Sequence, residues 1–359
     1  MPIKKISVNK DIHIARTLSS YYYLDDKYFN LSIEKIFAPS WQIITDSDQF
    51  RNTIYPFTFL QSSINEPLLL TKVDDKIYCI SNVCTHRGNI LCFKKNNSKK
   101  IICKYHGRVF DLKGRFLSAP GFEEAKQFPS KIDNLNKIKI RTWKKLIFVS
   151  IKPEINIEKI FNDIELRLGW YPFNELEYNK STSCEYIINA HWSLYCENYL
   201  EGFHVPFVHK GLKKDINLNT YQTILLENGV LQYTESKNKK NKLNIQKGYT
   251  DYKKNIYAYY YWIFPNIMLN FYNWGLSINI IEPINKNKTR IRFLSYPIKN
   301  YTQPLNTDAS LDKVEKEDQN IVLNIQKGIK SRLYNNGRYS PKHEIGVHHF
   351  HRLICKHLN

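Results

Sequence analysis

Three features that would assign the chain to a membrane, secreted or repeat class are missing from its sequence. Residues Met1 to Lys10 alternate between apolar and charged with no apolar stretch behind them, so no secretory signal is visible. The longest uncharged stretch, Asn255 to Ile281, is broken by Pro265, Gly275 and several asparagines, and its aromatic and β-branched residues suit strands better than a membrane helix. No internal repeat is visible. We expect a globular, cytoplasmic protein with no membrane association.

Cysteine pairs and acidic residues are also scarce. The seven cysteines are odd in number and scattered, which argues against a disulfide framework and leaves metal ligation or burial as their uses.

Acidic residues (33) are outnumbered by basic ones (53), giving a net charge of +20. Such a charge can indicate nucleic-acid binding. Here the lysines are spread along the chain, and the only runs, 94–100 and 237–242, lie in polar, loop-like stretches, so we predict no nucleic-acid partner.

The sequence divides into three parts. Residues 1–40 form an N-terminal helical segment with a helix over Asp25 to Phe37. Residues 41–150 form a small all-β unit, and residues 151–359 an α+β domain. The predicted strands are 67–73, 76–81, 100–102, 108–112 and 146–151 in the β unit, and 183–189, 221–226, 229–236, 256–264, 267–271, 276–281 and 289–296 in the second domain. Helices are predicted over 157–168 and, as a long helix covering one face of an antiparallel sheet, over Asp308 to Arg332.

The first candidate site combines Cys84-Thr-His86 with Cys103-Lys-Tyr-His106. Two thiolates and two imidazoles can hold zinc, but structural zinc sites usually leave two or more residues between paired ligands. A Rieske cluster, in which two cysteines hold one iron and two histidines the other, matches better. Gly88 and Gly107 would let the backbone approach the cluster closely.

The second candidate site lies in the run from Cys196 to His209, which contains Glu201, His204 and His209. Pro206 prevents one regular helix through both histidines, so a broken helix could direct them toward one point. Two histidines and one carboxylate are the ligand set of non-haem iron(II) oxygenases. Two nearby histidines alone remain a weak signal.

Both sites resemble motifs of one family. Segments 83–88, 103–107, 110–120 and 198–209 resemble the catalytic alpha subunit of Rieske-type non-haem iron ring-hydroxylating oxygenases, and the likeness is nearest to the choline and carnitine monooxygenase type. It extends from Phe37 to Arg352. One departure is visible, because members commonly have Trp after the His-Gly pair where this chain has Arg108.

The resemblance implies site residues for both centres. The 2Fe-2S cluster would be held by Cys84, His86, Cys103 and His106, and the mononuclear iron by His204, His209 and Asp318. Glu317 competes with Asp318 for the carboxylate role, whereas Glu315 and Lys316 are expected on a solvated helix face. Glu201 would hydrogen-bond ligand histidines of both centres across a subunit boundary, with Asn198 in the same outer shell.

The resemblance also implies an architecture and an activity. A Rieske β domain would precede a helix-grip catalytic domain in which a curved antiparallel sheet encloses the substrate. Electrons would pass from NAD(P)H through a separate reductase to the cluster and then to Fe(II), where O2 is activated. A head-to-tail homotrimer is expected by analogy.

The substrate would be a small molecule, and a quaternary ammonium compound held by aromatic side chains is one candidate. Aromatic residues that could line its pocket are Tyr257, Tyr259, Tyr261, Trp262, Tyr272 and Trp274, although aromatic residues in strands more often pack in a core. An aromatic or alicyclic ring hydroxylase or demethylase is the alternative within the family. A Rieske electron carrier is the alternative outside it. By the same resemblance, His343, His348, His349 and His351 are structural.

Overall fold

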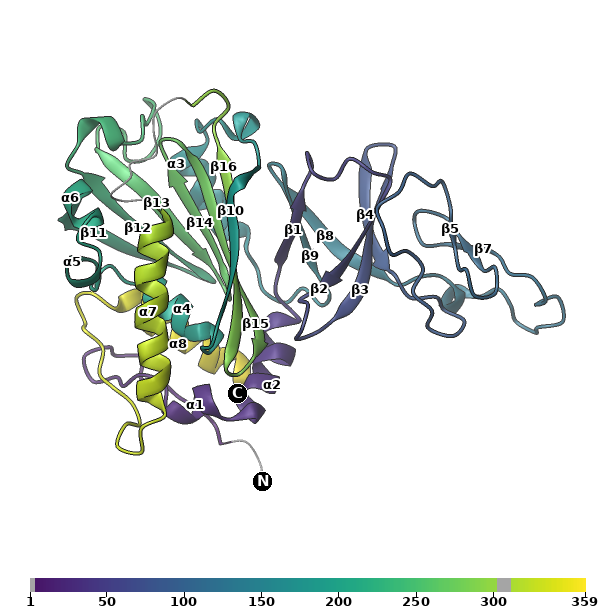
Figure 1. Cartoon of the computed structure of the whole chain (residues 1–359), viewed down its shortest axis with the longest axis horizontal. Coiled ribbons are helices and arrows are strands. Elements are labelled where there is room, and N and C mark those ends of the chain that lie inside the picture. Colours follow the sequence, from purple (N-terminus) through teal and green to yellow (C-terminus); the bar gives the residue numbers. More distant parts are fainter. Residues whose placement is uncertain (1–3, 302–310) are drawn as a thin grey trace. The chain divides into compact units, whose positions relative to one another are not determined.

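The computed structural model describes residues 4–301 and 311–359 and divides the chain into two compact units (Figure 1). The β unit comprises Ala38–Glu154. The α+β unit combines the residues up to Phe37 with Ile155–Asn359, so most of the predicted N-terminal segment belongs to the C-terminal unit. Within the described residues, no helix is both long enough and apolar enough to cross a membrane.

The β unit contains two antiparallel sheets. One has the strand order β1-β9-β8-β4-β3-β2 and the other β5-β6-β7. Their bounds are β1 Gln42–Asp46, β2 Ile54–Phe59, β3 Glu66–Val73, β4 Lys76–Ser81, β5 Ile101–Ile102, β6 Val109–Phe110, β7 Phe116–Ser118, β8 Lys137–Trp143 and β9 Leu146–Ser150, with a 3-10 turn at Lys131–Asp133.

Four of these strands were not predicted. Strands β1, β2 and β7 lie at sheet edges, where one side of the backbone is unpaired and the sequence is less constrained; β2 even contains Pro56. Strand β8 alternates lysine with apolar residues and is largely exposed. The sequence signals of these four strands are therefore weaker than those of the strands that were predicted.

A tight turn connects β6 to β7. Gly114 has φ +80°, and its N–H donates to the Asp111 carbonyl at 3.0 Å. A Cβ at Gly114 would lie only 3.2 Å from side-chain atoms of Ile80 and Leu135, both core residues of the unit. This position requires glycine for conformation and for space.

The α+β unit is built on a seven-stranded antiparallel sheet of order β10-β16-β15-β14-β13-β12-β11. Its strands are β10 Asn179–Ile188, β11 Ile216–Leu226, β12 Gly229–Ser236, β13 Ile256–Ile263, β14 Ile267–Tyr272, β15 Gly275–Asn285 and β16 Lys288–Pro297. All seven strands were predicted from their β-branched and aromatic content, and the α+β fold class is confirmed.

Helices cover this sheet. They are α1 Ser20–Leu24, α2 Asp26–Ser32, a π-helical turn at Ile33–Phe37, α3 Glu158–Leu168, α4 Trp192–Tyr199, α5 Val205–Val208, α6 Leu212–Asp215, α7 Leu311–Ile329 and α8 Ile345–Leu358, with 3-10 turns at Phe173–Glu175 and Lys239–Asn241. Helix α7 lies across one face of the sheet and packs against α4 (Figure 1). The predicted start of α7 at Asp308 lies outside the described residues. Helix α8, not predicted, packs on β11 and the π-helical turn.

Candidate metal centres and adjoining cavity

Two loops of the β unit carry the predicted cluster ligands and have the same backbone geometry. In the first, the Gly88 N–H donates to the Cys84 carbonyl at 3.0 Å, and in the second the Gly107 N–H donates to the Cys103 carbonyl at 3.0 Å. Both glycines have positive φ, +70° and +72°. The matching turns present each cysteine and its histidine from a rigid, internally bonded backbone.

The side chains of these loops fit a two-iron cluster. Both thiols are buried and hydrogen-bonded to each other, and the rings of His86 and His106 have centroids 4.7 Å apart. Within the described residues, the four do not form a set whose ligand atoms all lie within 4.8 Å of one another, as a single tetrahedral zinc would need. Burial opposes ionisation of Cys103, but backbone N–H groups of Tyr105 and His106 lower its pKa, which favours thiolate.

The second centre lies in the α+β unit, where ligand atoms of His204, His209 and Asp318 all lie within 4.8 Å of one another. Nε2 of His204 is 3.2 Å from Nε2 of His209, and Nε2 of His209 is 3.0 Å from Oδ1 of Asp318. His209 is buried, with 2% of its side chain exposed, while His204 and Asp318 are 17% and 13% exposed. Two imidazoles and a carboxylate thus converge as a non-haem iron site requires.

Two further carboxylates hold the outer nitrogens of these histidines. Glu201 Oε1 lies 2.6 Å from Nδ1 of His204, and Glu317 Oε2 lies 2.8 Å from Nδ1 of His209. Burial opposes protonation of His209, but Asp318 and Glu317 together raise its pKa. Glu317 therefore lies behind a histidine, whereas Asp318 is the carboxylate in the group of three.

The break between α4 and α5 directs the histidines to one point. Helix α4 ends at Tyr199, and α5 begins after His204 with Pro206 in its first turn. Between them, a Cβ at Gly202 would lie 2.6 Å from ring atoms of Tyr221 on β11, so the turn can approach the sheet only with glycine there. The interruption expected from Pro206 is present.

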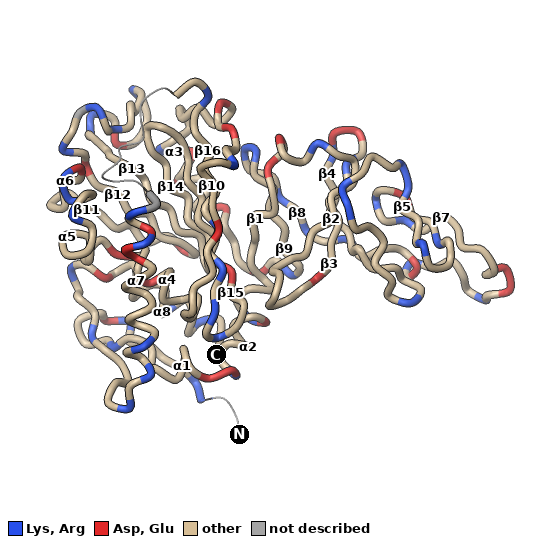
Figure 2. The backbone as a smooth tube through the Cα atoms, viewed as in Figure 1, with Lys and Arg blue, Asp and Glu red and all other residues tan. Residues whose placement is uncertain are grey.

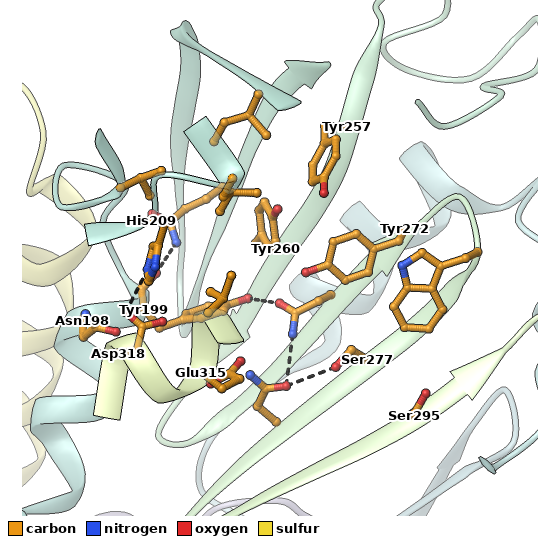
Figure 3. Close-up of a pocket in the computed structure, with 18 of the residues that line it drawn as sticks. Asn198, Tyr199, His209, Tyr257, Tyr260, Tyr272, Ser277, Ser295, Glu315 and Asp318 are labelled. Carbon is orange, nitrogen blue, oxygen red and sulfur yellow. Dashed lines mark hydrogen bonds and ion pairs between the residues drawn. The ribbon is translucent and has the colours of Figure 1, made fainter. Parts of the chain in front are cut away.

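A cavity of about 470 Å³ adjoins this centre and includes Asn198, Glu201, His204, His209 and Asp318 in its wall. Figure 3 shows several tyrosines directed into it from the sheet. The aromatic residues that line it are Tyr186, Tyr195, Tyr199, Tyr221, Tyr257, Tyr260, Tyr272, Trp274 and Tyr301. Its volume is in the range typical of small-molecule sites.

The predicted aromatic lining needs correction at three positions. Tyr257, Tyr272 and Trp274 line the cavity, but Tyr259, Tyr261 and Trp262 do not; all three are fully buried elsewhere. Beside Tyr257, the register between β12 and β13 shifts, and this bulge breaks the alternation of side chains between the two faces of the sheet. Tyr257 and Tyr260 therefore both reach the cavity. Such a bulge is invisible in the alternation of the sequence.

Tyr259 and Tyr261 instead have polar partners away from the cavity. The Tyr261 hydroxyl donates to Asp163 of α3 at 2.6 Å, and the Tyr259 hydroxyl donates to Asp251 at 2.9 Å. Trp262 packs edge-on against Phe350 of α8. These three aromatic side chains hold helices and loops onto the sheet.

Glu315 also lies elsewhere than predicted. It lines the cavity one helical turn before Asp318 and accepts a hydrogen bond from the Tyr195 hydroxyl, whereas Lys316 is exposed as expected. Burial, together with the neighbouring Asp318, raises the pKa of Glu315 to about 8. A cation bound in the cavity would favour its ionised form.

An uncharged polar network forms another part of the wall. The Tyr199 hydroxyl donates to Asn270 Oδ1 at 2.7 Å, and Asn270 Nδ2 donates to Asn279 Oδ1 at 3.3 Å (Figure 3). The Ser277 hydroxyl donates to the same oxygen of Asn279 at 3.3 Å. The sequence signal for these residues was asparagine within otherwise apolar strands.

The C-terminal histidines have separate partners. His351 bonds the Tyr339 hydroxyl at 2.6 Å, His348 the Asn9 carbonyl at 2.7 Å and His349 the Leu226 carbonyl at 2.8 Å. The ring of His343 stacks on Phe203 with centroids 4.6 Å apart. In the described parts of the chain they are not gathered into a metal-binding group.

Comparison with known proteins identifies the family. Residues 173–359 match the ring-hydroxylating alpha subunit catalytic domain, and residues 40–129 match the Rieske 2Fe-2S domain. The chain belongs to the family of ring-hydroxylating oxygenase alpha subunits. It is therefore an oxidoreductase with a Rieske 2Fe-2S cluster and a non-haem Fe(II), and the family implies a separate reductase as electron donor.

Individual relatives align with nearly the whole length of the chain. Choline monooxygenase of Arabidopsis thaliana is 25% identical and aligns with 96% of this chain and 83% of its own. The carnitine monooxygenase oxygenase subunit of Escherichia coli K12 is 26% identical, covering 95% and 94%. Among solved structures, the quaternary ammonium Rieske monooxygenase CntA with L-carnitine has a TM-score of 0.77 at 20% identity, covering 99% and 100%. Naphthalene 1,2-dioxygenase with indole has 0.70 at 16%, covering 96% and 92%.

Proposed function

We propose that this chain is the oxygenase component of a monooxygenase acting on a small quaternary ammonium compound that carries no acid group, such as choline. The four loop residues Cys84, His86, Cys103 and His106 would hold the cluster, and His204, His209 and Asp318 the iron. Overall, O2, two electrons and two protons would convert one substrate C–H bond to C–OH and release water, with the electrons drawn from NAD(P)H through the reductase.

The charge of the cavity wall carries this proposal. Although the chain has a net charge of +20, and Lys and Arg are spread over both units in Figure 2, none of the described residues lining the cavity is Lys or Arg. The lining contains three acids, Glu201, Glu315 and Asp318. A trimethylammonium group finds aromatic faces and a carboxylate here.

The same wall argues against an acidic substrate. The carboxylate of carnitine or γ-butyrobetaine would find no basic partner among the described residues of the cavity wall, and an unpaired charge is costly to desolvate. The hydroxyl group of choline could instead join the network of Tyr199, Asn270 and Asn279. Some relatives are named for choline and others for carnitine. The chemistry of the cavity wall is therefore what favours a substrate without an acid group.

The protein residues would bind and orient the reactants. An Fe(II) held by His204, His209 and Asp318 would supply the activation of O2 for attack on a C–H bond. Glu201 and Glu317 hold the two imidazoles with Nε2 toward the centre, and burial of His209 keeps bulk water from that side. Glu315 and the surrounding tyrosines would fix the ammonium group and aim a neighbouring carbon at the iron.

Assembly and location belong to the same proposal. Glu201 is 13% exposed and could accept a further hydrogen bond from a histidine of a neighbouring subunit, as expected for a head-to-tail homotrimer. None of the seven cysteines, all of which lie in the described residues, forms a disulfide, which is compatible with a reducing cytoplasm.

The test compares four compounds with the reconstituted enzyme and its reductase. We expect hydroxylation of choline, with little product from γ-butyrobetaine, from naphthalene, or from the carbon isostere of choline in which a tert-butyl group replaces trimethylammonium. Glu315→Gln should raise the KM for choline about tenfold or more, since it removes one buried charge opposite the cation. Asn320→Ala, exposed on the same helix, is the control.

Two outcomes would overturn the proposal. Preferential turnover of γ-butyrobetaine would show that an acid group is recognised, and preferential turnover of naphthalene would favour the ring-hydroxylase alternative. An unchanged KM for choline in Glu315→Gln would remove Glu315 from cation recognition.

A further inference from the structure

The residue that follows each loop glycine reaches across to the opposite loop. Asn89, after Gly88, places its Nδ2 at 3.6 Å from the Cys103 sulfur. Arg108, after Gly107, donates from Nη1 to the Thr85 hydroxyl at 2.9 Å. Thr85 lies between the predicted ligands Cys84 and His86 in the sequence. The guanidinium group of the second loop is therefore hydrogen-bonded to the residue between the two ligands of the first loop.

Arg108 is enclosed to a degree that is rare for arginine. Only 3% of the residue is exposed, and its guanidinium carbon lies 5.3, 5.0 and 5.2 Å from the ring centroids of Phe116, Phe122 and Phe128. Buried arginine is costly unless it is paired or stacked on aromatic rings. Phe122 also contacts the ring of His86, with centroids 5.2 Å apart.

The positive charge is only partly neutralised. Asp133 is the acid beside it, and its Oδ1 is 3.3 Å from Nη1, longer than a strong charged hydrogen bond. The other oxygen of Asp133 accepts from the N–H and hydroxyl of Ser130 at 2.8 and 3.1 Å. Among the described residues, Nε of Arg108 has no hydrogen-bond partner. The guanidinium charge is therefore only loosely paired inside the protein, beside the ligand loops.

We propose that Arg108 is a positioning residue of the Rieske centre, which ties the two ligand loops together and raises the reduction potential of the cluster through its buried charge. Reduction adds one electron to the cluster, and a nearby cation in a poorly screened environment stabilises the added negative charge. The sequence alone revealed only that Arg108 stands where family members commonly have Trp. The inference rests on the ligand assignment made under the proposed function, but not on the identity of the substrate.

Charge variants on the two sides of the ion pair provide the test. Arg108→Gln removes the cation and should lower the midpoint potential, while Asp133→Asn removes the anion and should raise it. We expect each to change the equilibrium constant for reduction about tenfold, equivalent to about 59 mV for a one-electron couple. The potential is read in the purified full chain by redox titration followed by EPR of the reduced cluster, without substrate or reductase.

Two controls separate charge from structure. Arg108→Lys keeps the charge and should leave the potential near that of the wild type. Arg115→Gln removes an arginine whose side chain is 67% exposed in the same unit, and its effect should be much smaller because water screens that charge.

Shifts of the midpoint potential in the same direction in Arg108→Gln and Asp133→Asn, or no shift in either variant, would overturn the proposal. Loosening of the ligand loops alone would not move the potential in opposite directions in the two variants. If Arg108→Gln fails to assemble a cluster, Asp133→Asn decides alone, and a potential that falls or stays unchanged refutes the charge effect. A wild-type protein without any Rieske EPR signal would instead refute the ligand assignment in the proposed function.

Discussion

The two candidate metal centres are assembled in opposite ways. The four proposed cluster ligands lie between Cys84 and His106, in two short loops that bond to themselves and to each other. The proposed iron site joins His204 and His209 to Asp318, which only the packing of α7 against α4 brings near. A site built from local turns can be read from spacing, whereas one built across the fold needs its tertiary contacts.

The centres also differ in exposure. His86 and His106 are not buried, as suits residues that pass or receive electrons at a surface. His209 is 2% exposed, and it forms part of the wall of the cavity of about 470 Å³. The first arrangement favours exchange with a protein partner, and the second favours exclusion of water around a small molecule.

The largest expected effect comes from variants that test whether the two centres bind their iron independently. His209→Ala removes one of the three proposed iron ligands, so product formation should fall by roughly a thousandfold or more while the Rieske EPR signal is retained. Iron analysis should show loss of mononuclear iron only. The reciprocal variant Cys103→Ser should lose the cluster signal and keep iron at the other centre; loss of both kinds of iron in either variant would contradict independent sites.

The carboxylates behind the histidines should have smaller effects than the ligands. Glu317→Gln leaves the group of three intact but weakens the hydrogen bond to Nδ1 of His209, so iron affinity or turnover should fall about 10- to 100-fold. Iron retention during dialysis against a chelator measures this, with Asn320→Ala as the matched control. An effect of Glu317→Gln as large as that of Asp318→Ala would mean that the two acids have been assigned to the wrong roles.

Acid should weaken the α+β unit through a buried histidine. Burial lowers the pKa of His191 to about 3, and its Nδ1 is 2.9 Å from the Ser193 hydroxyl in the first turn of α4. Because the folded-state pKa lies below the unfolded value of about 6.5, the unfolded state binds the proton first, and stability falls as pH drops below that value, by up to about 1.4 kcal/mol per pH unit.

Denaturant unfolding at about pH 7.5 and about pH 5.5 measures this loss. His191→Gln should flatten the dependence by roughly 1 kcal/mol over that interval, and equal pH dependence in variant and wild type would exclude His191 as its source. The β unit provides the contrast, because its two histidines, His86 and His106, are not buried.

Prediction from sequence succeeded where the signal was local and repeated. The strands of the α+β sheet and the helix break before Pro206 follow from side-chain alternation and backbone restriction. It failed at β1, β2 and β7, since edge strands are only half paired, and at Tyr259 and Tyr261, since a bulge reversed the side they face. Helix α8 was missed although most of its residues are buried.

By itself, the sequence determined which chemical groups are available and which of them are neighbours along the chain: two Cys/His loops, two close histidines and acids on a distant helix. Only the tertiary structure decided that Asp318 joins the histidines while Glu317 lies behind one of them, that Glu315 faces a cavity, and that Arg108 is enclosed by aromatic rings. The reason is physical. Spacing fixes the order of side chains, but their direction and burial depend on how helices and strands far apart in the chain pack together.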